Sequence, residues 1–267
     1  MPLCYRLALL LLVTTVWSCE VESLDDPIIV PVVDQEFNFQ LWQNLSSTGS
    51  SPLEIRMSTV EDYDCMNVAI LSNYTRVGNR LELTLFDILD PEACLAGSGP
   101  AYGIEAIDDI EESSYDLRIE LQGVVSNVGT LMATNEAFTV AMQDENGISW
   151  LQYEMRRIPE NAVWGYIGYA DATGLALAED FLAELAAAGS ASTLADGYYG
   201  YYTLKEDGST IEINQTGLPP ADQNMTFISQ FDGSAGELEQ LILDFLADAD
   251  PQFRLMVRDG KGNAWQR

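Results

Sequence analysis

The chain has 267 residues and is strongly acidic, with 42 Asp and Glu residues against 12 Lys and Arg and a net charge of −30. Its hydrophobic content of 47% is that of a folded protein, and its length suffices for one large domain or two ordinary ones. A surface this anionic repels the phosphate backbone, which excludes nucleic acid as a partner. The chain contains no histidine, which removes Ser-His-Asp and Cys-His catalysis and histidine zinc sites.

The first residues have the pattern of an export signal. Arg6 precedes a short apolar run at 7–13, which is too short to span a bilayer and has the length of a secretory signal. The run Val16-Trp17-Ser18-Cys19 then resembles the lipobox of bacterial lipoproteins, in which the cysteine is acylated and becomes the mature amino terminus. The same spacing suits ordinary signal peptidase, with cleavage at the same bond. The resemblance implies a signal peptide at 1–18, a lipid on Cys19, and a place in the bacterial cell envelope, at the outer membrane or cell surface.

After the signal, residues 19–36 form an acidic tether in which two prolines oppose a helix. From 37 to 158 the hydrophobic pattern has period two, and turn sequences separate the runs. The clearest alternation places leucine or isoleucine at every second position of 81–85 and of 117–121. This pattern predicts seven to nine short strands that form an antiparallel β-sandwich of immunoglobulin-like architecture.

Two cysteines remain once Cys4 leaves with the signal and Cys19 takes a lipid. In an oxidising compartment, Cys65 and Cys94 are expected to form a disulfide that closes a loop of about 30 residues, a cross-link that stabilises by about 3–4 kcal/mol in the chain-entropy model. The alternative is two reduced cysteines that are buried separately.

After Pro159 the pattern changes to a mixture of strands and helices. Strands are predicted at 162–169, 198–205, 210–215, 225–231 and 253–258, with helices at 175–188 and after the capping box Ser234–Glu237. The order β-α-β-β-α-β, with one extra hairpin arm, is that of the ferredoxin-like fold. The sequence therefore predicts a mainly β chain with an α+β domain at 159–267.

Aromatic residues gather on two predicted strands of this second domain. Because a ferredoxin-like sheet carries its helices on one face, aromatic side chains on the other face could stack against sugar rings or a peptide. We expect Trp164, Tyr166, Tyr199 and Tyr201 to be the stacking groups of such a site. The alternative is that this face packs against the sandwich or a second copy of the chain, or that the rings fill the core.

Two acidic clusters are candidates for calcium, because this ion takes six to eight oxygen ligands in flexible geometry. One cluster includes Asp62 and Asp64, and the other Asp108 and Asp109. Neither has EF-hand spacing, and clusters of this kind arise by chance in a chain with 42 carboxylates. Calcium is the one cofactor that the sequence suggests.

These features predict an exported, lipid-anchored envelope or cell-surface protein with a non-catalytic binding or scaffold role. Its expected partners are the membrane, through the amino-terminal lipid alone, and a glycan or protein. Two alternatives stay open, a carboxylate-dependent glycan hydrolase and a structural subunit of an envelope assembly.

Overall fold

The computed structural model describes residues 36–48, 51–190, 193–206, 208, 210–214, 218, 221–249 and 253–267. The predicted signal peptide, the lipid site at Cys19 and nearly all of the predicted tether lie outside these residues. The described residues all belong to one compact unit, which contains three sheets and two helices. The chain is therefore mainly β, as predicted.

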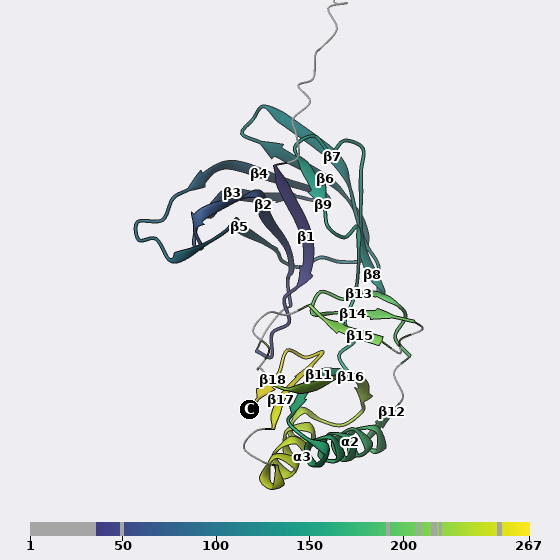
Figure 1. The fold of residues 1–267 in the computed structure, drawn as a ribbon. Helices are drawn as coiled ribbons and strands as arrows, with labels where there is room; N and C mark the ends of the chain where they lie inside the picture. Colours follow the sequence, from purple (N-terminus) through teal and green to yellow (C-terminus); the bar gives the residue numbers. More distant parts are fainter. Residues whose placement is uncertain are drawn as a thin grey trace, which may run out of the picture. The chain divides into compact units, whose positions relative to one another are not determined.

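Ten strands from the amino-terminal part form a single curled sheet, a half-barrel (Figure 1). Their spatial order is β10-β8-β7-β6-β4-β3-β5-β2-β1-β9. Most neighbours are antiparallel, but β4 runs parallel to β6, β3 parallel to β5 and β1 parallel to β9. The strands are β1 (Phe37–Gln43), β2 (Leu53–Cys65), β3 (Ala69–Val77), β4 (Arg80–Leu89), β5 (Ala96–Ile107), β6 (Ser113–Leu121), β7 (Val125–Ala133), β8 (Ala137–Met142), β9 (Ile148–Trp150) and β10 (Glu154–Arg156).

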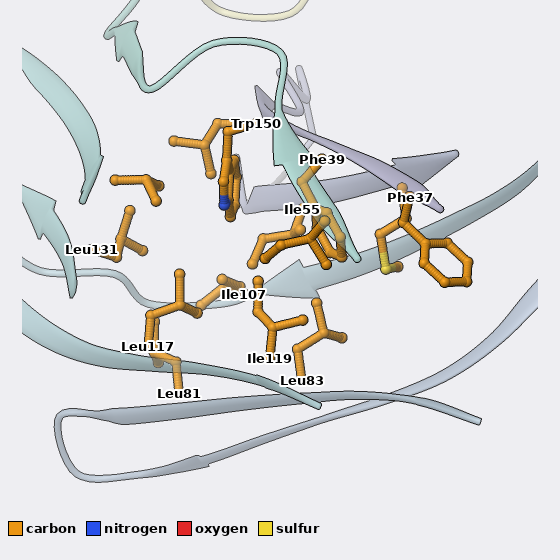
Figure 2. Close-up of a cluster of buried hydrophobic side chains, with 14 of the residues drawn as sticks. Phe37, Phe39, Ile55, Leu81, Leu83, Ile107, Leu117, Ile119, Leu131 and Trp150 are labelled. Carbon is orange, nitrogen blue, oxygen red and sulfur yellow. The ribbon is translucent and has the colours of Figure 1, made fainter. Parts of the chain in front are cut away.

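The predicted period-two pattern is confirmed, but the predicted two-sheet sandwich is replaced by one continuous sheet. Leu81, Leu83 and Leu85 are buried, whereas the residues between them are partly exposed. Figure 2 shows that buried side chains from distant strands, among them Phe39 and Leu131, gather in one cluster. The sheet therefore buries one face of each strand by curling around its own core, which satisfies the same pattern as a sandwich would.

The predicted disulfide between Cys65 and Cys94 is present in the structure. Cys65 is the last residue of β2, and Cys94 lies in the connection from β4 to β5. The bond therefore ties the end of one strand to the segment that leads into its neighbour, since β2 pairs with β5.

We expect the double variant Cys65→Ser/Cys94→Ser to lose about 3 kcal/mol of unfolding free energy, because the bond restricts the unfolded chain over a separation of 29 residues. Urea denaturation with and without dithiothreitol measures the effect. The reductant should lower the stability of the wild type and leave the double variant unchanged. Equal sensitivity of the two proteins would contradict the prediction.

The carboxyl-terminal part forms a five-stranded antiparallel sheet with the order β12-β16-β11-β17-β18. Both helices pack on one face of it, since buried residues of the helices share a cluster with Val163, Ile167 and Val257 of the strands. The elements are β11 (Ala162–Tyr169), α2 (Ala172–Ala187), β12 (Gly189–Ser190), β16 (Gln223–Phe231), α3 (Ala235–Asp248), β17 (Arg254–Asp259) and β18 (Ala264–Gln266). The predicted capping box at Ser234 and Glu237 starts α3.

A small three-stranded sheet lies between β12 and β16 in the chain. It consists of β13 (Gly197–Tyr198), β14 (Tyr202–Lys205) and β15 (Thr210–Ile213). The prediction of one strand over 198–205 is wrong, because Gly200 has a φ of +80° and the amide of Tyr199 donates to the carbonyl of Tyr202. The Tyr199–Tyr202 segment is therefore a hairpin turn rather than a straight strand.

Candidate ligand-binding groove

The four aromatic residues predicted to form an open stacking surface are all buried. Trp164 is 0% exposed, Tyr199 2%, Tyr166 5% and Tyr201 6%. The three-stranded sheet covers the face of β11 that we expected to be open: Trp164 shares a buried cluster with Tyr199, Tyr201, Tyr202 and Leu204. The predicted stacking surface is thus an internal aromatic cluster. Only Tyr201 of the four also lines a groove.

Burial dominates the chemistry of the tyrosines in this region. Desolvation raises the pKa of the Tyr198, Tyr199 and Tyr202 phenols above their ordinary value of 10.0. The hydroxyl of Tyr199 donates to the carbonyl of Ala195, whereas that of Tyr202 has no hydrogen-bond partner among the described residues.

We expect the protein to lose stability above about pH 10. Folding raises the pKa of each phenol. The stability that depends on protonated phenols is therefore complete below the pKa of tyrosine in the unfolded chain. It is lost as the pH rises from there through the pKa values of the folded protein. A spectrophotometric titration at alkaline pH, with circular dichroism on the same samples, measures both processes. Tyr202→Phe should shift unfolding to higher pH with little effect at neutral pH, because the removed hydroxyl is unpaired. Ionisation of every tyrosine near pH 10 in the folded protein would contradict this account.

The acidic clusters do not assemble the calcium site that the sequence suggested. Within the described ranges, no group of three or more Asp, Glu, Cys or His side chains is placed to hold a metal ion. Asp62 and Asp64 lie near the end of β2, and Asp108 and Asp109 lie between β5 and β6. The guanidinium of Arg76 donates to the carbonyls of Asp108 and Asp109, so backbone oxygens of that loop already have a cationic partner.

A groove of about 570 Å³, a volume typical of small-ligand sites, lies over the outer face of the half-barrel. Strand register explains its floor: Asn38 of β1 lies beside Ser58 of β2, which lies beside Tyr102 of β5. The next row is Gln40, Arg56 and Ile104. Further lining comes from Trp42, Met57, Gly103 and Leu151. The side chains that alternate with the buried core thus supply the floor.

The wall of the groove comes from the carboxyl-terminal part of the chain, from Tyr201, Asn214 and Arg258. The Tyr201 ring lies 4.6 Å from the Trp42 ring, centre to centre, and its hydroxyl accepts from the amide of Leu45. The side-chain amide of Asn214 donates to the carbonyl of Gly200, which fixes the Tyr199–Tyr202 turn. Contacts to floor and turn therefore hold the wall in place before any ligand arrives.

The two arginines of the groove are held differently. The guanidinium of Arg56 lies 3.8 Å above the Trp42 ring and donates from Nε and Nη2 to Oε2 of Glu54, whose other oxygen accepts from Asn44. The guanidinium of Arg258 lies 5.4 Å from the Tyr201 ring. Its Nε is buried and has no hydrogen-bond partner, and Arg258 forms no salt bridge with a carboxylate of the described residues. Arg258 is therefore the less satisfied of the two cations.

The groove differs from the rest of the chain in charge. Among the described residues that line it, none is Asp or Glu and two are Arg, in a chain with 42 acidic and 12 basic residues. Tyr102, Ile104 and Leu151 on its floor and rim are each more than half exposed. Such a surface offers hydrogen bonds and apolar contact together with the positive charge of Arg258, whereas the charge of Arg56 is already paired with Glu54. The described lining residues hold no carboxylate pair for acid–base chemistry.

No protein family, curated protein or solved structure matches the chain. In the part of the chain that the structure describes, no helix is long and apolar enough to cross a membrane.

Proposed function

We propose that the protein is an exported, lipid-anchored binding protein that holds its ligand in the groove beside Trp42 and Tyr201. The observation that carries this proposal is the composition of the groove, whose described lining residues include two arginines and no Asp or Glu in a chain of net charge −30. Acidic side chains cover so much of the chain that their absence from a preorganised groove indicates a site for a ligand that carboxylates would repel.

The fold we propose for 159–267 is the ferredoxin-like one, enlarged by the three-stranded sheet. The strand order β12-β16-β11-β17 with two helices on one face supports it, because β11 and β12 are separated by an antiparallel strand, as in the split βαβ arrangement. In this proposal the inserted sheet serves to build the groove wall, since Tyr201 lies in its first turn and Asn214 directly follows β15.

Export and lipid anchoring are supported by two features. A disulfide such as Cys65–Cys94 forms and persists in an oxidising compartment, and the run Val16-Trp17-Ser18-Cys19 resembles a lipobox. The test is expression of the full chain in a diderm bacterium, followed by fractionation and mass spectrometry of the mature amino terminus. We expect a diacylglyceryl group on Cys19 and recovery in the membrane fraction, and we expect Cys19→Ser to abolish both. A mature chain that starts at an unmodified Cys19 would refute the anchor.

The binding role is tested by screening the mature protein on immobilised oligosaccharides and peptides. We expect the variant Tyr102→Ala/Ile104→Ala to bind every specific ligand at least about tenfold more weakly than the wild type, because it removes exposed apolar contact area from the floor. A matched control is Val77→Ala/Met132→Ala, at exposed apolar positions that do not line the groove. Equal loss in both variants, or a ligand insensitive to the first, would show that the groove is not the site.

A further inference from the structure

Arg258 is the group in the groove whose bonding is least complete. It lies on β17 opposite Trp164 of β11, on the face of the sheet that the aromatic cluster covers. Its Nε is buried without a hydrogen-bond partner in the described residues, and a cation–π contact with the Tyr201 ring, 5.4 Å away, takes the place of a carboxylate. A ligand in the groove cannot reach this buried Nε, but the terminal Nη1 and Nη2 atoms of Arg258 also have no hydrogen-bond partner among the described residues. A ligand oxygen with negative charge would supply their acceptor and form a charge-assisted hydrogen bond.

Arg56, which is paired with Glu54, places a second guanidinium over the neighbouring Trp42 ring. Its hydrogen bonds use Nε and Nη2, both to one oxygen of Glu54, and its side chain retains 35% exposure. The two guanidinium groups stack on rings whose centres are 4.6 Å apart, so they belong to one recognition surface. This arrangement favours a ligand with more than one anionic group, or with one such group beside a polar ring.

The uncharged part of the groove resembles the surfaces that bind sugars. Gln40 and Ser58 present amide and hydroxyl groups, which donate to and accept from sugar hydroxyls. Tyr102 is 57% exposed, so its ring is available to stack on a pyranose. A peptide that binds by strand addition needs the unpaired backbone of an edge strand, and β2 offers none because it lies between β1 and β5.

We infer that the ligand is an acidic oligosaccharide, of the uronic acid type, whose carboxylates bind Arg258 and Arg56 while its rings lie along the floor at Tyr102. This inference rests on the proposed function and specifies its ligand class. Long-range repulsion by the chain opposes every anion, so selection has to come from these short-range contacts.

The test is isothermal titration of the mature protein with tetragalacturonate and with its fully methyl-esterified form, which keeps the sugar and removes the charge. We expect the acid to bind at least about tenfold more tightly than the ester. Arg258→Gln should abolish this preference, Arg56→Gln should reduce it, and Arg258→Lys should restore part of it. Arg118→Gln, which removes a cation from β6 outside the groove, is the charge-matched control and should leave the preference unchanged.

Three other results of this titration would overturn the inference, and each points to a different conclusion about the groove. Equal binding of acid and ester that still depends on Tyr102 would reject the anionic ligand and keep the groove as the site. Arg258-dependent binding of tetraglutamate with no binding of either sugar would replace the saccharide by an acidic peptide. Binding of none of the three probes would reject the inference, and the array screen with Tyr102→Ala/Ile104→Ala would then decide separately whether the groove binds anything.

Discussion

Replacement of Trp164 by alanine is expected to lower the free energy of unfolding by about 4 kcal/mol, because it empties the centre of the aromatic cluster. The indole is 0% exposed and lies 5.7 Å from the Tyr201 ring and 5.0 Å from the Tyr202 ring, centre to centre. These rings cannot close the resulting cavity easily, since Tyr201 also packs on Trp42. Urea denaturation followed by far-ultraviolet circular dichroism measures the loss.

The matched control is Phe86→Ala, which removes an aromatic ring that is 48% exposed. We expect this variant to lie within about 1 kcal/mol of the wild type, because surface substitutions rarely cost more. A loss of similar size in both variants would mean that the destabilisation comes from general loss of apolar area and not from the cluster around Trp164.

The strands of the half-barrel could be predicted because the burial pattern is local. Leu117, Ile119 and Leu121 alternate with exposed or partly exposed residues in the structure as they alternate with polar residues in the sequence. The choice between two packed sheets and one curled sheet is not local. It depends on which strands pair, such as β4 with β6, and the buried face of each strand is the same in both arrangements.

The sequence shows which aromatic residues form the cluster, but it does not show whether their side chains are buried or exposed. The concentration of Trp and Tyr at 164–169 and 198–202 left two interpretations open, a stacking surface and a packed interior. The structure shows the second, since the rings are buried in one cluster. Gly200 was the available signal for a turn, since a glycine between tyrosine pairs interrupts a strand. With that turn, the segment folds back over Trp164 and closes the face that was expected to bind.

The groove itself had no sequence signature. Its floor uses outward positions of β1, β2 and β5, whose polar residues are those of any exposed strand face. Its wall comes from residues at 201, 214 and 258, far along the chain. The available hint was the scarcity of basic residues, since a chain with only 12 makes each exposed or unpaired arginine informative. Only the fold brings Arg56 and Arg258 to neighbouring rings.

Gly165→Ala is expected to destabilise the protein by on the order of 3 kcal/mol, because a methyl group at this position has no room. Gly165 lies at the middle of β11, between Phe227 of β16 and Val257 of β17. An added Cβ would lie 2.2 Å from the carbonyl oxygen of Met256 and 2.6 Å from the Phe227 ring. A backbone oxygen cannot move without opening the sheet, so the cost is steric and falls on the central pairing of the three strands.

Gly236→Ala separates this steric effect from the general effect of replacing a glycine. Gly236 lies in the first turn of α3, and the nearest atom to an added Cβ is the Ser234 hydroxyl oxygen at 4.0 Å. Alanine there should raise stability by up to about 1 kcal/mol, since it restricts the unfolded chain and favours the helix. Thermal and urea unfolding of the two variants should therefore change in opposite directions. A change of unfolding free energy with the same sign in both variants would contradict this account. It would show that the contacts around β11 do not decide whether an alanine fits at Gly165, and that the sheet opens there more readily than its packing indicates.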